Sequence, residues 1–218
     1  MAEPSSETIT QKPRIPMLKH APQTTEETRR SLKWRVVDIA VGAAVGVMSG
    51  VMFWVFDGMS YGLFPLLTLI LPGSAALLHA LFYFPATLGL LIVRKPGASA
   101  YVLIVASFVE VVLGTKYSVS LVVIAFVQAL AAETVFAVFR YRRWTLGVTL
   151  LSSVAIGIVY NFYLLFFYYQ AFSFFSPRGL IGTACELLSA VVFAGFGSWV
   201  LYRALAKSGV LTRFASGR

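Results

Sequence analysis

Charged residues are scarce in this chain of 218 residues. Asp, Glu, Lys and Arg make up 12% of it, whereas hydrophobic residues make up 58%. Ordinary soluble domains contain about 25% charged and about 45–50% apolar residues. Because a water-soluble fold could not bury so much apolar surface, the composition excludes an ordinary soluble domain and predicts an all-α integral membrane protein.

Cysteine and histidine are almost absent as well. The single cysteine, Cys185, excludes an intramolecular disulfide and any CxxC metal or redox site. The two histidines, His20 and His79, give little basis for a metal site or a His-based triad, and no GxSxG, HExxH or Walker A motif is present. We therefore predict no catalytic residue, no metal and no cofactor. A chain without a nucleotide site would need partner subunits for ATP-driven transport.

The apolar residues form runs that approach the length of a membrane span. A helix needs about 20 residues to cross a hydrocarbon core about 30 Å thick. Six such runs cover residues 35–56, 74–93, 98–113, 118–139, 145–172 and 179–205. They predict a six-transmembrane-helix bundle.

Residues 58–73 between the first two runs are also apolar, but Gly62, Pro65, Pro72 and Gly73 interrupt them. We interpret this segment as a loop or re-entrant segment, a candidate lid, rather than as a seventh span. The predicted domains are a disordered basic tail at 1–33, a six-helix membrane domain at 34–207 and a second tail at 208–218.

Basic residues outnumber acidic ones by 18 to 9, and their positions indicate an orientation. With both ends inside, every basic residue except Lys116 and Arg178 falls on the cytoplasmic side, as the positive-inside rule predicts. The opposite orientation would export the basic cluster at 140–143. We therefore predict a multi-pass protein of the bacterial cell membrane with cytoplasmic N- and C-termini. Its basic ends would contact membrane lipids, and no nucleic acid is expected as a partner.

Ionisable side chains at membrane depth cost at least about 2.5–3.5 kcal/mol each, so each needs a partner or a function. Asp57, His79, Glu110 and Glu186 are expected toward the outer side. Three carboxylates near one imidazole favour a cationic or nitrogen-rich ligand. For Asp57 we favour a contact with headgroups or a pairing with a neighbouring polar group. For Glu110 and Glu186, a cavity-facing role and a structural role both stay open.

Further polar and aromatic residues lie within the predicted spans. Glu133, roughly 10 Å from the inner end of its span, pairs with Arg140, with another helix or with a ligand. The Gln128 amide either fastens two helices or binds a ligand, and tyrosines beside Asn161 could hold a flat heterocycle. The candidate substrate-binding residues are Trp54, His79, Phe82, Tyr83, Glu110, Gln128, Glu133, Tyr160, Asn161, Tyr163 and Glu186.

A stripe of small residues follows the first span. Gly42, Gly46 and Gly50 recur every four residues, beside Ala40 and Ala44. Such stripes let another helix approach closely. Contact within the chain and docking of a partner subunit explain the stripe equally well.

Several motifs spread along the chain are shared with a known family. They are residues 94–99 (RKPGAS), Glu110 shortly before Gly114, 126–133 (FVQALAAE), 139–142 (FRYR), Ser176-Pro177 and the region around 212–214. Together they resemble the YkoE-type S components of energy-coupling factor (ECF) importers, over roughly residues 34 to 215. The resemblance implies a membrane subunit that binds a thiamine-related vitamin or its hydroxymethylpyrimidine precursor. Such a subunit works beside a transmembrane coupling protein and ATP-binding subunits, and its first helix meets the coupling protein.

The chain departs from the family pattern near the expected pocket. Leu103 replaces an expected acidic residue, Ala129 and Ala131 replace glycines, and Asn161 and Glu186 stand where Asp and Arg are expected. An S component for another water-soluble vitamin therefore stays an alternative. Two others are a membrane scaffold or assembly protein, and an intramembrane enzyme or proton-coupled carrier that uses Glu133.

Overall fold

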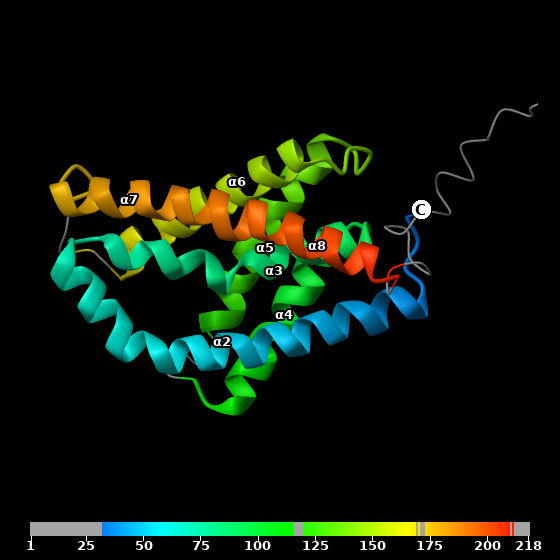
Figure 1. Ribbon diagram of the computed structural model, residues 1–218, viewed down its shortest axis with the longest axis horizontal. Coiled ribbons are helices and arrows are strands. Elements are labelled where there is room, and N and C mark those ends of the chain that lie inside the picture. The colour runs from blue at the N-terminus through cyan, green and yellow to red at the C-terminus, as the bar shows by residue number, and fades with distance from the viewer. Residues whose placement is uncertain (1–31, 116–119, 169, 171–172, 210, 212–218) are drawn as a thin grey trace, which may run out of the picture. The chain divides into compact units, whose positions relative to one another are not determined.

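The computed structural model describes residues 32–115, 120–168, 170, 173–209 and 211. Most of the two predicted tails lies outside these residues. The described chain is helical, in the order α2 (Val36–Ile70), the 3₁₀ helix η1 (Ser74–Phe82), α3 (Phe84–Val93), α4 (Ala98–Leu113), α5 (Ser120–Val138), α6 (Leu146–Phe167), α7 (Pro177–Ser189), the π-helix η2 (Ala190–Gly197) and α8 (Ser198–Lys207) (Figure 1).

These elements form six helical segments, because η1 runs into α3 and α7 continues through η2 into α8. Five segments are long and apolar enough to cross a membrane, namely Val36–Ile70, Ser74–Val93, Ser120–Val138, Leu146–Phe167 and Pro177–Lys207. The sixth, Ala98–Leu113, is shorter. The predicted all-helical membrane fold with six helices is confirmed. The cytoplasmic placement of both termini stays a prediction.

The first helix is longer than the sequence suggested. α2 continues to Ile70, so the prediction of a loop or re-entrant segment from residue 58 was wrong for most of that segment. A Cβ atom added at Gly58 or Gly62 would meet nothing within 4 Å, so neither glycine marks a turn or a close contact. Pro65 removes one backbone hydrogen bond but does not end the helix, since a helix still satisfies most backbone groups in lipid. Figure 1 shows α2 bending in its second half.

The chain does turn at the end of the predicted segment. Gly73 has a φ of 98°, in the left-handed region that favours glycine, and it precedes η1. A Cβ atom there would lie 2.8 Å from the Gly182 backbone nitrogen of α7. The turn at Gly73 thus lets η1 fold back beside α7, where it positions the site described below.

The glycine stripe of α2 is an internal contact. A Cβ atom at Gly46 would lie 2.7 Å from the Cβ of Val105, and one at Gly50 would lie 2.5 Å from the Ala106 carbonyl oxygen. A Cβ atom at Gly42 would lie 2.8 Å from the Tyr101 ring. Because α4 covers this face, Gly42, Gly46 and Gly50 do not offer the partner-docking surface that the sequence left open for them. The neighbouring Ala40 and Ala44 are exposed.

We expect Gly50→Ala to destabilise the protein by about 1–3 kcal/mol, because the added methyl group meets a backbone oxygen that cannot rotate away. Gly58→Ala in the same helix is the matched control. It should leave stability unchanged or raise it slightly, since its surroundings are open and alanine favours helix. Thermal unfolding of the two purified variants in detergent measures the difference. Equal stability would contradict the close packing of α2 on α4.

Contacts between distant residues fasten one end of the helical bundle. The Trp34 indole donates to the Pro96 carbonyl oxygen at 2.9 Å, and the Arg94 guanidinium donates to the Tyr202 hydroxyl at 2.8 Å. The same guanidinium lies 5.6 Å from the centre of the Trp144 ring, a cation–π distance. The start of α2, the α3–α4 turn, the start of α6 and the end of α8 therefore meet at one end.

Candidate functional site

A cavity of about 320 Å³ lies between α2, η1, α4, α5 and α6, within the size range of small-molecule sites. Its polar lining residues are Asp57, Ser60, His79, Ser107, Glu110, Ser120 and Gln128. Its aromatic lining residues are Phe53, Phe64, Phe82, Tyr160, Tyr163 and Tyr168. Carboxylates, an imidazole and an amide thus share one cavity with several rings.

Two carboxylates line this cavity from neighbouring helices, Asp57 from α2 and Glu110 from α4. The Thr115 hydroxyl donates to Asp57 at 3.3 Å. Glu110 is only 2% exposed, and its Oε1 accepts no hydrogen bond within the described part of the chain. A buried carboxylate oxygen without a donor is costly, so a bound molecule that supplies an N–H or a positive charge would be stabilised here.

Aromatic rings form another part of the cavity lining. Tyr160 and Tyr163, one helical turn apart on α6, lie nearly parallel, with ring centres 6.5 Å apart and an interplanar angle of 12°. The His79 imidazole meets the Tyr160 ring edge to face at 5.5 Å. Such faces can hold a flat heterocycle and attract a positively charged one.

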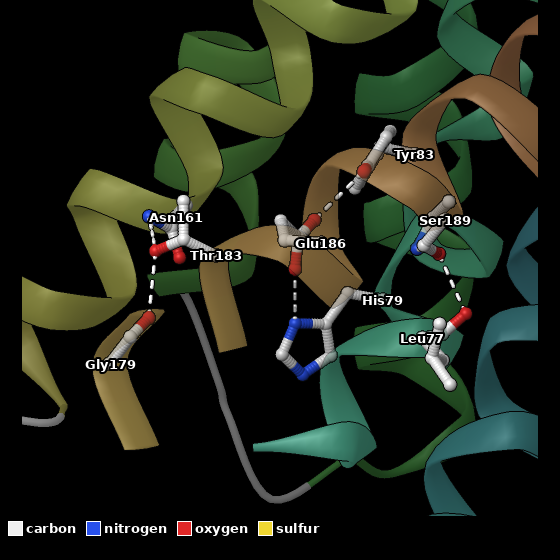
Figure 2. Close-up of polar contacts among 9 residues, drawn as sticks. Leu77, His79, Tyr83, Asn161, Gly179, Thr183, Glu186 and Ser189 are labelled. Carbon is white, nitrogen blue, oxygen red and sulfur yellow. Dashed lines mark hydrogen bonds and ion pairs between the residues drawn. The ribbon is translucent and has the colours of Figure 1, made fainter. Parts of the chain in front are cut away.

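His79 is held by a network of buried polar residues (Figure 2). Its Nδ1 lies 2.6 Å from Glu186 Oε2, and the Tyr83 hydroxyl donates to Glu186 Oε1 at 2.8 Å. The 3₁₀ geometry of η1 places His79 and Phe82, three residues apart, on the same side, and both line the cavity. The network therefore fixes the orientation of a ring in the cavity wall.

A smaller cavity of about 60 Å³ lies beside the first, and His79 lines both. Asn161, Arg178 and Glu186 are among its other lining residues. The Asn161 amide donates to the Thr183 hydroxyl at 3.0 Å. The amide is thus satisfied by a helix-to-helix bond between α6 and α7.

Comparisons with known proteins agree with this architecture. A solved structure described as "Crystal structure of an S-component of ECF transporter" matches with a TM-score of 0.77 and 27% identity, over 85% of this chain and 92% of that one. The "Putative HMP/thiamine permease protein YkoE" of Bacillus subtilis (strain 168) is 26% identical over 189 residues, which are 85% of this chain and 91% of that protein. The family model "ABC-type cobalt transport system, permease component" matches residues 37–159. The chain belongs to this family of transport subunits.

Within the family, the likeness to the solved structure identifies the chain as the S component of an ECF transporter. It is a multi-pass protein of the cell membrane that binds a substrate and does not transform it. The predicted membership in the YkoE-like S components is confirmed. The cavity is accordingly the candidate substrate site of an S component.

The structure distributes the predicted substrate-binding residues over three places. The main cavity is lined by His79, Phe82, Glu110, Gln128, Tyr160 and Tyr163. Asn161 and Glu186 line the smaller cavity. Tyr83 lines neither cavity, but its hydroxyl donates to Glu186 and its ring packs edge to face against Tyr160. Trp54 and Glu133 line neither cavity. Substrate contact stays a prediction for the residues of the main cavity.

One cavity-lining face of α2 was not identified from the sequence, which for Asp57 on that face favoured a role outside a cavity. Phe53, Asp57, Ser60 and Phe64 all line the main cavity, and they recur at intervals of four, three and four residues. That spacing marks one face of a continuous helix. It was not visible as a pattern because a break was expected after residue 56. Trp54, which was chosen instead, is 42% exposed.

Glu133 lies in a structural contact instead of the cavity. Its Oε1 accepts from the backbone N–H of Ser99, the second residue of α4, at 2.9 Å, and its Oε2 accepts from the Tyr141 hydroxyl at 2.6 Å. A carboxylate at a helix N-terminus is favoured by the helix dipole. Burial and the hydrogen bond to Glu133 raise the pKa of Tyr141 above its ordinary value. Glu133 therefore joins α5 to α4 and to the turn that follows α5.

We expect Glu133→Ala to lower stability by about 1–3 kcal/mol, because the Ser99 N–H loses its buried acceptor. Tyr141→Phe, which removes only one of the two bonds, should cost less. Ligand affinity of the folded fraction should stay the same in both variants. Thermal unfolding and a binding titration measure the two effects. A stable Glu133→Ala protein that no longer binds would return Glu133 to the substrate site.

Proposed function

We propose that this S component captures thiamine or a related pyrimidine precursor from outside and delivers it with the coupling protein and the ATP-binding subunits. The observation that carries the proposal is the pairing of Glu110, a buried carboxylate with an unbonded oxygen, with the aromatic rings of α6 in one cavity. Thiamine combines a positively charged ring with an aminopyrimidine. Its charge suits Asp57 and Glu110, and its flat rings suit Tyr160 and Tyr163. The Bacillus subtilis relative, which is named as an HMP/thiamine permease, supports the same substrate class.

An organic ligand also fits the side chains better than a metal ion does. Within the described residues, no three His, Cys, Asp or Glu side chains come together as a set of metal ligands. Binding of labelled thiamine and of hydroxymethylpyrimidine to the purified protein at sub-micromolar ligand tests the proposal. Saturable binding of either one is the expected result. Binding of another vitamin only would reassign the substrate, and binding of neither thiamine nor hydroxymethylpyrimidine would refute the proposed substrate.

The exposed charges support the predicted orientation. All five acidic residues that the structure describes, Asp38, Asp57, Glu110, Glu133 and Glu186, are buried. Exposed basic residues gather at the fastened end of the bundle, where α2 begins, α5 ends and α8 ends; they include Arg35, Arg142, Arg143, Arg203 and Lys207. By the positive-inside rule this end is cytoplasmic, where it suits anionic lipid headgroups. The carboxylates of the main cavity lie nearer the other ends of α2 and α4, which favours capture from outside.

For the contact with the coupling protein we propose the exposed side of α2 at Ala40 and Ala44. Both are exposed, whereas the adjacent glycine face is covered by α4. Small side chains there let a partner helix approach closely. Exposed apolar neighbours such as Val36 and Met48 extend the surface along the helix.

We expect the double variant Ala40→Leu/Ala44→Leu to lower vitamin uptake by about tenfold or more, because bulk at a close helix contact costs about 1–3 kcal/mol. Ligand binding by the isolated S component should not change, since neither residue lines a cavity. Ala137→Leu, at an exposed alanine of α5, is the control. Uptake in whole cells and binding to purified protein are the two measurements. Normal uptake in the double variant would exclude this docking surface.

A further inference from the structure

The His79–Glu186 pair is buried and carries at least one proton in each hydrogen-bonded arrangement. Glu186 is 0% exposed, and the Tyr83 hydroxyl already donates to its Oε1. The 2.6 Å contact between His79 Nδ1 and Glu186 Oε2 requires a hydrogen between the two atoms. Figure 2 shows the carboxylate between Tyr83 and His79, with the other ring nitrogen of His79 on the far side.

The net charge of the pair decides what that other nitrogen can do. A neutral His79 that donates from Nδ1 to a Glu186 carboxylate leaves one negative charge buried at membrane depth, which is costly. One additional proton makes the pair neutral. If that proton is on the ring, both ring nitrogens carry hydrogen. If it is on Glu186, the acid donates to Nδ1 and the neutral ring carries its hydrogen on Nε2. In both neutral arrangements, Nε2–H is a donor.

Two carboxylates near the pair oppose a further negative charge on it. Asp57 and Glu110 line the same main cavity as His79, so a further negative charge on the pair would be repelled. The rings that face His79, from Phe64 on α2 and Tyr160 on α6, carry no charge. Arg178 lines the smaller cavity together with His79 and Glu186, so one positive charge near the pair stands against the two carboxylates of the main cavity.

No described residue forms a hydrogen bond with His79 Nε2 in this structure, although His79 lines the main cavity. We propose that His79 Nε2–H is a ligand-binding donor and that it selects ligands with an acceptor nitrogen or oxygen. The inference rests on the proposed function and specifies its ligand. The cavity offers a donor from η1 and acceptors from α2 and α4, so the preferred heterocycle has an acceptor on one side and a donor or positive charge on the other.

A measurement without ligand tests the donor directly. The chain contains two histidines, so the full-length His20→Gln variant leaves His79 as the only one. With ring-¹⁵N histidine and the protein in lipid nanodiscs at pH 7, long-range ¹H–¹⁵N spectra distinguish the imidazolium and the two neutral tautomers. The expected result is hydrogen on Nε2. A neutral ring with hydrogen on Nδ1 alone would overturn the inference.

A binding experiment then tests the role in recognition, with hydroxymethylpyrimidine as an uncharged probe. His79→Gln, which places an amide N–H near the position of Nε2, should retain most of the affinity. His79→Asn, which cannot reach that position, should bind at least about tenfold more weakly than His79→Gln.

Equal affinity of His79→Asn and the unmodified protein would overturn the role in recognition. If neither thiamine nor hydroxymethylpyrimidine binds the unmodified protein, the proposed substrate fails. The ligand-free spectrum still decides whether Nε2 is a donor, so the two failures are distinguishable.

Discussion

Replacing Glu110 with glutamine is expected to weaken thiamine binding by roughly 30-fold or more. The loss of one charged partner from a buried pair costs about 2–5 kcal/mol, of which 2 kcal/mol already corresponds to roughly 30-fold in affinity. We expect this loss of affinity at Glu110 because Glu110 is buried in the main cavity and its Oε1 has no donor among the described residues. A calorimetric titration of purified protein with thiamine measures the change.

The same substitution should not destabilise the ligand-free protein. Glutamine removes a buried charge without breaking a hydrogen bond to Oε1, so thermal stability should stay the same or rise. Glu133→Gln is the matched control, since it changes another buried carboxylate that lies outside the cavity and holds two donors. It should lower stability and spare affinity. If Glu133→Gln lowered the affinity and Glu110→Gln did not, the ligand would lie near Glu133, which would contradict the proposed site.

The fold could be predicted from the sequence because few backbone structures can span a membrane. Backbone groups in lipid must be satisfied within each segment, so apolar runs of sufficient length predict helices reliably. The same rule explains the error in α2. Pro65 and two glycines end or weaken helices in water, but within α2 the proline removes one bond and the glycines face open space. A breaker residue carries less information at membrane depth than in a soluble domain.

The candidate site could be predicted only in part from the sequence. The cost of polar groups in the membrane singled out Glu110, Gln128 and His79, which all line the cavity. The same argument singled out Glu133, whose oxygens are taken by Ser99 and Tyr141. The free-energy cost of a carboxylate in the membrane does not show whether its hydrogen-bond donors come from a bound ligand or from the protein. That distinction depends on partners far along the chain, such as Ser99, which lies 34 positions before Glu133.

Contacts between distant segments also explain why the His79 network could not be predicted. His79 and Glu186 are 107 residues apart, and they meet because the turn at Gly73 places η1 beside α7. The sequence placed both residues toward the same side of the membrane but did not indicate that they bond to each other. Because of this bond, the two candidate substrate-binding residues form one unit, in which Glu186 orients the His79 ring.

Removing Glu186 from its network with His79 and Tyr83 is expected to cause the largest loss of stability. Glu186→Ala should destabilise the protein by about 3–5 kcal/mol, because it leaves His79 Nδ1 and the buried Tyr83 hydroxyl without their acceptor. Tyr83→Phe alone should cost far less. The two changes combined should cost less than the sum of the single variants, because phenylalanine no longer needs the acceptor that alanine removed. Unfolding of the four proteins in detergent completes the cycle. Strictly additive losses would show that Tyr83 and Glu186 do not depend on each other, which would contradict the hydrogen bond between them.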